Sequence, residues 1–234
     1  IYVAGGQSNG TPSHKVFRLK YPDGSNWEHL PDFPGPPRLQ AVACVQDNAT
    51  GSALYLIGGY SAAGANPSGL IYNINTQTWS STAPVTVNGN PTAVAGAVCT
   101  KSGNSCIVCM GGVNKEVFDN AITRQTNPPA DNDIQQKLYL TQQPEWYRFG
   151  TSLLVYNTIT DTWTQLPGSP LLARAGAAIA DTDINGHHRW VVINGELKPG
   201  IRSQQVTAVG VENHTSFGWL NWAVLCAYLV GMLV

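Results

Sequence analysis

Three glycine pairs recur at an even spacing along this chain, each at the end of a short apolar run. The runs are Tyr2–Gly6, Tyr55–Gly59 and Ile107–Gly112, and Val191–Gly195 is a degenerate fourth copy. The pairs lie about fifty residues apart, which is a period of proteins built from one repeated sheet. This spacing strongly constrains the fold, because each repeated unit needs its neighbours to bury its apolar surface.

A pair of aromatic residues recurs in phase with the glycines. Six residues separate Tyr72 from Trp79 and Tyr156 from Trp163, and the first repeat has a looser version that ends at Trp27. The polar residues between each pair predict the turn of a hairpin, because Asn, Thr and Asp are frequent in turns. Every repeat therefore contains at least one hairpin that follows its glycine pair.

A strand of small residues opens each following unit. The three predicted strands are Ala41–Val45, Ala95–Cys99 and Ala175–Ile179. With the glycine run and the aromatic hairpin, they give four strands per period. Small residues suit a position with close neighbours on both sides, as near the axis of a ring of sheets.

These elements together resemble the kelch repeat, in which four-stranded sheets stack as blades around an axis. The sequence therefore predicts an all-β fold, a kelch-type β-propeller over residues 1–215, followed by an apolar helix. An unrelated β-sandwich also uses short strands, but it would not keep glycine pairs at a constant spacing. The 24 Gly and 15 Pro residues suit short strands joined by tight turns.

Charge and cysteine content exclude several functions. The net charge is -1 and the sequence has no Lys/Arg block, so no nucleic-acid partner is expected. Five cysteines form no complete disulfide framework. Cys106 and Cys109 have redox or zinc spacing, but side chains three apart on a strand point to opposite faces. We expect them to pack in the core.

A second metal-like pattern is also incomplete. Residues Asp181–Gly186 open like a calcium loop, yet Val192 stands where that loop needs a bidentate acid. Asn185 and Gly186 fit a turn between two strands better. His187 and His188 flank this turn without an evident ligand partner, so we predict no metal site and no cofactor.

The third repeat carries an inserted segment over residues 113–152. Its last part has helical apolar spacing at Ile134 and Leu138, with Asp131, Asn132 or Asp133 available as the N-cap. Long insertions in compact domains are usually lids or binding elements. The alternative is a surface excursion without a function.

The tail changes character after the last repeat. Residues 217–234 carry no charge and would span roughly 27 Å as a helix, close to the thickness of a bilayer core. Trp219 and Trp222 lie where an interfacial aromatic belt would place them. We therefore predict the start of a transmembrane helix over residues 216–234. A hydrophobic closing strand of the propeller is the alternative.

Three stretches, Phe33–Gln40, Gly111–Phe118 and Asn194–Arg202, identify a family. In this order they resemble the bacterial N-acetylneuraminate (sialic acid) mutarotases, which are six-bladed kelch propellers. The resemblance covers roughly residues 1–210. It implies that about three and a half of six blades are present. Because the first residues already read as a strand, we expect the remaining blades upstream of Ile1.

The order of the blades resembles the cyclically permuted branch of this family. The tail, from Gly218 onward, is similar to the first membrane helix of a sodium:solute symporter. The resemblance implies a bacterial periplasmic domain anchored to the inner membrane and fused to a symporter. Such a domain would equilibrate sugar anomers beside the carrier that imports one of them.

The resemblance also implies an activity and its residues. A mutarotase interconverts the α and β anomers of N-acetylneuraminate by opening and closing the ring, with the sugar as its partner. It assigns the proton acceptor to Glu196 and a matching guanidinium to Arg202, with Arg38, Asn114 and Arg174 as further pocket residues. A tight Glu196–Arg202 pair would oppose a base role, so we expect the substrate between them.

Two alternatives remain open at this point. Glu196 and Arg202 could form an ordinary surface ion pair, which contributes ~0–1 kcal/mol. The whole chain could instead be a non-catalytic kelch module that binds a carbohydrate or a protein beside a membrane carrier.

Overall fold

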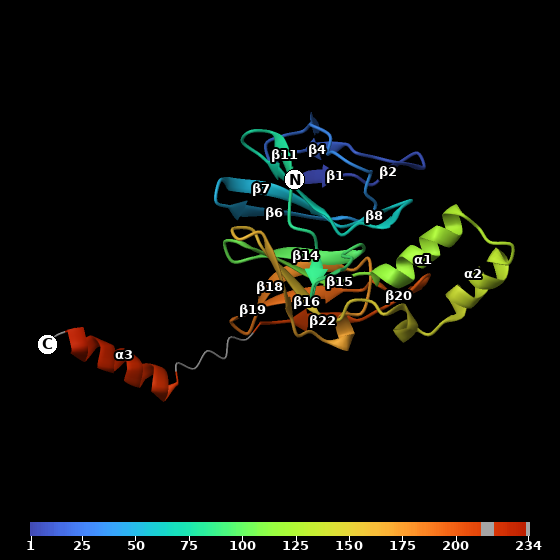
Figure 1. Cartoon of the computed structure of the whole chain (residues 1–234). Coiled ribbons are helices and arrows are strands. Elements are labelled where there is room, and N and C mark those ends of the chain that lie inside the picture. The colour runs from blue at the N-terminus through green and yellow to red at the C-terminus, as the bar shows by residue number, and fades with distance from the viewer. Residues whose placement is uncertain (212–217, 233–234) are drawn as a thin grey trace.

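Short antiparallel strands dominate the computed structural model, which describes residues 1–211 and 218–232. They form four main sheets that follow one another along the chain. Figure 1 shows these sheets stacked in chain order, from the sheet with β1 to the sheet with β19. The fold is all-β and of the kelch-like propeller type, as the repeats predict.

The two middle sheets have four strands each. The first has the order β11-β10-β7-β6, with β6 at Val42–Asn48, β7 at Gly51–Ile57, β10 at Gly69–Asn73 and β11 at Thr78–Ser81. The other has the order β14-β15-β16-β17, with β14 at Ala97–Ser102, β15 at Cys106–Gly111, β16 at Leu153–Asn157 and β17 at Thr162–Leu166.

The two outer sheets have three strands each. The N-terminal sheet has the order β1-β4-β5, with β1 at Tyr2–Ala4, β4 at Val16–Arg18 and β5 at Glu28–Leu30. The C-terminal sheet has the order β18-β19-β22, with β18 at Ala178–Ile184, β19 at His187–Ile193 and β22 at Val206–Val209.

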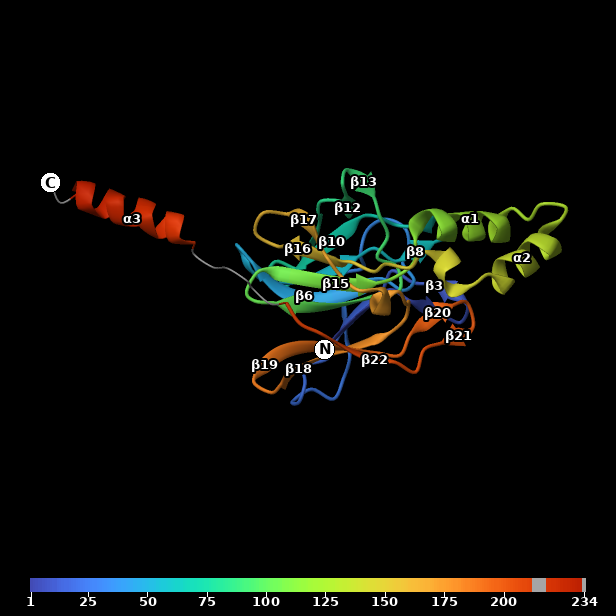
Figure 2. The same ribbon diagram turned by 90° about the horizontal axis from the view of Figure 1, so that it is seen from below.

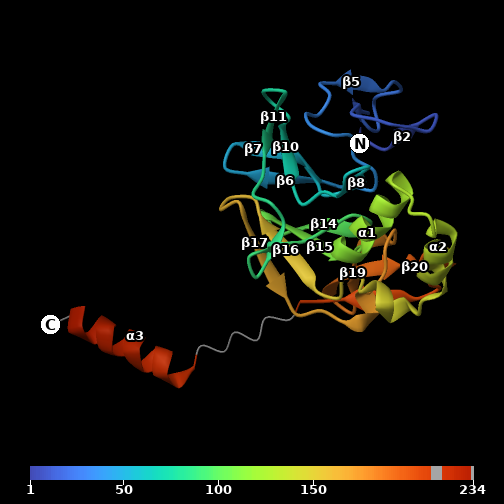
Figure 3. The same ribbon diagram turned by 45° about the vertical axis from the view of Figure 1, so that its right-hand side comes forward.

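Small hairpins follow the first two glycine pairs and the degenerate fourth copy, Asn194–Gly195. They are β2 (Gln7–Ser8) with β3 (Thr11–Pro12), β8 (Tyr60–Ser61) with β9 (Gly64–Ala65), and β20 (Glu196–Lys198) with β21 (Ile201–Arg202). In the third repeat, helices take the place of the hairpin. Figures 2 and 3 show the hairpins and these helices gathered at one end of the sheets. A fourth hairpin, β12 (Thr86–Val87) with β13 (Asn90–Pro91), joins the two middle sheets.

The predicted aromatic pairs lie directly opposite each other on neighbouring strands. Tyr72 faces Trp79 and Tyr156 faces Trp163, with ring centroids 5.0 and 5.1 Å apart. The indole of Trp79 donates to the Pro31 carbonyl of the preceding repeat at 3.0 Å. Trp163 donates in the same way to Ala83 at 3.2 Å. The tryptophans therefore hold the exit of one sheet against the next.

The first repeat departs from this pattern. By strand register, Leu19 stands at the place of the tyrosine and Trp27 at the place of the tryptophan. The neighbouring residues Arg18 and Glu28 form an ion pair at 2.6 Å. Trp27 lies just before β5 and is 49% exposed. The first repeat thus keeps the tryptophan of the pair and has a leucine in place of its tyrosine.

Each pair of neighbouring sheets shares a hydrophobic core. Tyr55 and Tyr156 pack edge to face across the two middle sheets, with ring centroids 5.7 Å apart, and both are buried. Cys109 belongs to this core, whereas Cys106 is half-buried. Burial of Cys109 confirms the packing role predicted for it.

The strands of small residues start later than predicted. They begin at Val42, Ala97 and Ala178 because the residue before each strand adopts a positive φ or follows one that does. Gln40, Gly96 and Gly176 have φ of 50, 66 and 61°. A left-handed residue breaks the extended conformation.

The insertion contains two helices and a 3₁₀ turn. They are α1 at Lys115–Thr126, α2 at Asn132–Thr141 and η1 at Pro144–Tyr147, and a second 3₁₀ turn, η2, lies at Pro170–Leu172. The predicted helix is α2, and its N-cap is Asp131. Its side chain makes no capping hydrogen bond. Ile134 and Leu138 are exposed, so their spacing does not mark a buried face.

The turn predicted at Asn185 and Gly186 is confirmed. Asn185 and Gly186, with φ of 54 and 76°, form the turn between β18 and β19, as expected. A turn with two positive φ values suits a two-residue hairpin. Helix α1 was not predicted from the sequence.

The apolar tail contains helix α3 at Trp219–Met232, whose fourteen residues are all exposed. Among the described residues, no helix has both the length and the apolar character needed to span a membrane. The predicted segment 216–234 includes 216, 217, 233 and 234, which lie outside the described residues.

The glycine pairs can be tested by matched substitutions. A Cβ on Gly111 would lie 2.4 Å from the Arg174 carbonyl oxygen, whereas a Cβ on Gly89 would meet nothing within 4 Å. Both residues have positive φ, at 70 and 77°. Gly89→Ala should therefore lower the free energy of unfolding by about 1–2 kcal/mol, the cost of placing a residue with a Cβ in the left-handed region. Gly111→Ala should cost roughly 1–3 kcal/mol more, from overpacking.

Denaturant unfolding of both variants measures this difference. Equal losses of unfolding free energy would show that the close approach at Gly111 does not constrain the fold.

Candidate functional site

Glu196 leaves the end of β19 through two residues with positive φ. Asn194 and Gly195 have φ of 56 and 99°. A Cβ on Gly195 would lie 3.0 Å from the Ala177 Cβ, so the site needs glycine. The backbone of Glu196 then exchanges two hydrogen bonds with Ala175, at 2.7 and 2.9 Å. The segment just before β18 therefore fixes the backbone of Glu196.

Arg202 faces Glu196 across the β20–β21 hairpin. Its Nη2 lies 3.5 Å from Glu196 Oε1, a longer separation than a direct hydrogen bond. The Arg202 side chain is 71% exposed and the Glu196 side chain 34%. The structure brings the two together in a loose pair, which leaves both groups accessible to a ligand.

Asn114 lies in the same pocket. Its side-chain oxygen caps α1 by accepting a hydrogen bond from the Val117 amide at 3.2 Å. Its amide nitrogen makes no hydrogen bond to another described residue. Asn114 can therefore cap the helix and still present a donor to a ligand.

Arg38 and Arg174 do not line this pocket. Both are buried. Their guanidinium groups bind the backbone carbonyl of the first residue of a glycine pair and a carbonyl just before the strand that follows the small hairpin. Arg38 donates to the carbonyls of Gly58 at 3.0 Å and Ser68 at 2.7 Å. Burial lowers the pKa of Arg38 and of Arg174.

Arg174 repeats the contacts of Arg38 two repeats later. It donates to the carbonyls of Asn194 at 3.1 Å and Gln205 at 3.0 Å, and to the Thr207 hydroxyl at 2.6 Å. Each arginine thus ties the first residue of a glycine pair to the strand that returns beside it. Arg174 therefore holds the turn that leads to Glu196 through the Asn194 carbonyl.

The pocket around Glu196 has a volume of about 220 Å³. Several elements converge on it, and its lining comprises Gln40, Tyr60, Val113, Asn114, Val117, Phe118, Tyr139, Tyr147, Phe149, Ala175, Gly176, Glu196, Pro199 and Arg202. The lining therefore has a charged and polar part, with Asn114, Glu196 and Arg202, and an aromatic part, with Phe118, Tyr139 and Tyr147. We call these parts the charged wall and the aromatic wall. Such a mixture is typical of small-molecule sites.

The inserted segment supplies the aromatic wall. The Tyr147 hydroxyl donates to the Tyr139 carbonyl, and their rings pack edge to face with centroids 5.3 Å apart. Burial raises the pKa of both phenols, so both stay protonated at neutral pH. The repeats carry no signal for these two tyrosines, because the insertion has no equivalent in the other repeats.

A charged cluster docks the insertion onto the second repeat. Asp119 of α1 accepts a hydrogen bond from the Ala65 amide at 2.6 Å and pairs with Lys115 at 2.5 Å. Lys115 also donates to the Ala65 carbonyl at 3.0 Å. Lys198 of β20 donates to Gln142 at the end of α2 at 2.7 Å. The insertion is thus fastened on both sides of the pocket.

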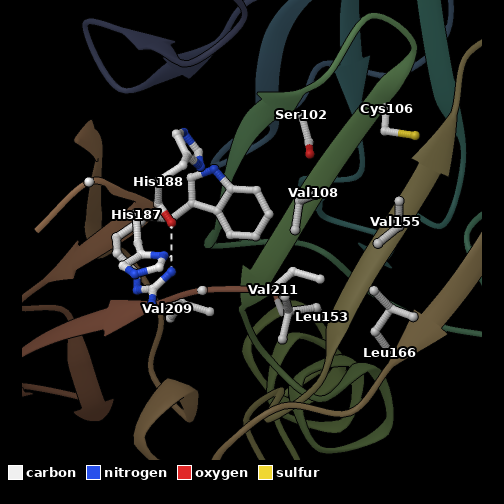
Figure 4. Close-up of a pocket in the computed structure, with 14 residues that line it drawn as sticks. Ser102, Cys106, Val108, Leu153, Val155, Leu166, His187, His188, Val209 and Val211 are labelled. Carbon is white, nitrogen blue, oxygen red and sulfur yellow. Dashed lines mark hydrogen bonds between the residues drawn. The ribbon is translucent and has the colours of Figure 1, made fainter. Parts of the chain in front are cut away.

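A larger cavity of about 720 Å³ lies elsewhere, between the sheets that contain β16 and β19. Figure 4 shows His187 and His188 on one side of it and Val155, Leu153 and Leu166 on the other. Its lining includes no carboxylate. Over the described residues, no three His, Cys, Asp or Glu side chains are grouped closely enough to hold a metal ion.

Comparison with known proteins places the chain in a family. The family model described as N-acetylneuraminate epimerase matches residues 1–229. The chain belongs to the N-acetylneuraminate epimerase family. An N-acetylneuraminate epimerase of Yersinia pestis (strain Pestoides F) is 32% identical over 193 residues, which are 78% of this chain and 46% of that protein.

A second member of the epimerase family shows the same extent of similarity. The N-acetylneuraminate epimerase of Haemophilus influenzae (strain PittEE) is 31% identical over 219 residues, covering 87% of this chain and 54% of that protein. The chain spans about half the length of these curated relatives.

A solved structure supports the fold. The structure of YjhT superposes with a TM-score of 0.68 at 23% identity, covering 91% of this chain and 66% of that one. This likeness shows that the two chains share a fold.

Proposed function

We propose that this chain carries the active site of a sialic acid mutarotase, which interconverts the α and β anomers of N-acetylneuraminate. The observation that carries the proposal is the loose Glu196–Arg202 pair at the mouth of a mixed polar and aromatic pocket. Membership of the N-acetylneuraminate epimerase family supports it. The chemistry needs no cofactor, because ring opening breaks one C–O bond and moves protons without a net oxidation or reduction.

Glu196 is the proton acceptor in this proposal. Its carboxylate takes the proton of the anomeric hydroxyl while the bond between the anomeric carbon and the ring oxygen breaks. The ring oxygen takes a proton from solvent water, and an open-chain keto acid results. Rotation about the single C–C bond beside the carbonyl carbon then presents the other face of the carbonyl. Reclosure on that face reverses both proton transfers. Positioned acid–base groups of this kind typically give about 10²–10⁴-fold acceleration.

Arg202 holds the carboxylate of the sugar. A guanidinium is permanently charged and matches a carboxylate in a planar fork. The 3.5 Å separation from Glu196 leaves the fork free of a direct hydrogen bond to that carboxylate. A sugar acid bound there would bring its anomeric carbon, which carries the carboxylate, next to Glu196.

We further propose that the four sheets are consecutive blades of a six-bladed kelch propeller, of which this chain contains about three and a half. The three-stranded N-terminal sheet supports this, because Val3, Phe17 and Trp27 line an open apolar hollow that a neighbouring sheet could cover. An experimental structure of the full-length protein with a number of sheets other than six around the axis would contradict this proposal.

The tail carries a separate proposal: that α3 belongs to a membrane anchor, the domain being periplasmic and joined to a sodium:solute symporter. The uncharged and exposed surface of α3 supports it. The full-length protein should then co-float with phospholipid vesicles, and a protein truncated after residue 217 should not. Recovery of both proteins in the unbound fraction would exclude an anchoring role.

Glu196→Gln tests the catalytic proposal. The substitution keeps the size of the side chain and removes its basicity, so anomer exchange of N-acetylneuraminate should fall about 10²–10⁴-fold toward the spontaneous rate. NMR exchange spectroscopy on the full-length protein measures this directly. Glu28→Gln is the matched control, because Glu28 also pairs with an arginine but lies outside the pocket.

Unchanged exchange in Glu196→Gln would contradict the assignment. It would favour the alternative function, a non-catalytic kelch module that binds a carbohydrate or a protein.

A further inference from the structure

Gln40 stands at a backbone position where the next two repeats have glycine. Its φ of 50° matches those of Gly96 and Gly176, at 66 and 61°. The three are also linked in series, because Gly96 donates to the Gln40 carbonyl at 3.0 Å and Gly176 donates to the Gly96 carbonyl at 2.7 Å. Gln40, Gly96 and Gly176 are therefore equivalent residues of successive repeats.

A glutamine is the less favourable choice at this position. Residues with a Cβ adopt the left-handed region at a cost that glycine does not have. Non-glycine residues in this region are enriched at functional sites. Backbone conformation therefore does not explain why residue 40 is a glutamine, and its side chain needs another explanation.

The Gln40 carboxamide has no structural task within the described residues. It is exposed and makes no side-chain hydrogen bond to another described residue. Its Oε1 lies 3.3 Å from where a Cβ on Gly96 would be, so the side chain extends over the neighbouring glycine. The same residue lines the pocket with Asn114, Glu196 and Arg202.

We propose that Gln40 is a substrate-binding residue that hydrogen-bonds the polar substituents of the sugar and holds it against Glu196 and Arg202. This inference rests on the proposed function. A carboxamide offers two donors and one acceptor, which complement hydroxyl and acetamido groups. Gly96 leaves space beside the Gln40 side chain, so one repeat contributes the polar group and the next repeat contributes the room that it occupies.

Gln40→Gly separates binding from stability. Glycine suits the backbone at residue 40, so the melting temperature should stay the same or rise. Loss of the hydrogen bonds should weaken equilibrium binding of N-acetylneuraminate about 5- to 10-fold, measured by calorimetric titration of the full-length protein. The maximal exchange rate should change much less, because Glu196 is intact.

Gln77→Gly is the matched control. Gln77 has φ of 56° in the turn between β10 and β11, outside the pocket. This substitution should affect stability in the same direction and leave sugar binding unchanged. Gln40→Asn provides a second test variant, because asparagine tolerates positive φ but its amide is one methylene shorter. It should also weaken binding.

Three outcomes decide between the two proposals. Unchanged binding in Gln40→Gly and Gln40→Asn, with an active parent protein, would overturn the role of Gln40 alone. Weakened binding with a parent that binds the sugar but does not exchange its anomers would support Gln40 and overturn the catalytic proposal. A parent that does not bind the sugar would overturn both.

Discussion

Backbone hydrogen bonds between successive sheets are the constraint on which the site depends. Near the hairpin end, Gly6 donates to the Arg38 carbonyl at 2.9 Å and Gly112 donates to the Arg174 carbonyl at 2.8 Å. Both donors have positive φ, as Gly96 and Gly176 do. The close approach leaves no room for a Cβ on the glycine that precedes each donor. The glycine pairs therefore set both the spacing and the orientation of the sheets.

Two buried arginines complete this arrangement. A buried guanidinium requires hydrogen-bond partners, and the carbonyls beside the glycine pairs provide them. Because Arg174 binds the Asn194 carbonyl, the turn before Glu196 is held from behind. The accessible groups, Glu196 and Arg202, then lie on a hairpin with a rigid base. Rigid support of this kind is what a positioned acid–base group needs.

The insertion gives this end of the fold its pocket. Where other repeats have a two-stranded hairpin, the third has α1, α2 and η1, which bring Phe118, Tyr139 and Tyr147 against the charged wall. One replaced hairpin thus converts an open edge into a site with an apolar side. The charged contacts of Asp119 and Lys198 keep this wall in place.

Much of this arrangement was predictable from the sequence, because each short pattern recurs in several repeats and each recurrence supports the same strand assignment. The glycine pairs and the Tyr–Trp pairs gave the middle sheets correctly, and Glu196 and Arg202 share one short loop. The partners of Arg38 and Arg174 were not predictable, because those carbonyls come from a following part of the repeat. The aromatic wall comes from a segment without a repeated equivalent. Gln40 could have been found by aligning it with Gly96 and Gly176.

The most direct test of the account is an experimental structure of the full-length protein with N-acetylneuraminate bound. We expect the sugar carboxylate on the Arg202 guanidinium and the anomeric hydroxyl at about 2.6–3.2 Å from the Glu196 carboxylate. A sugar bound instead in the cavity lined by His187 and His188, with Glu196 still facing Arg202 alone, would contradict it.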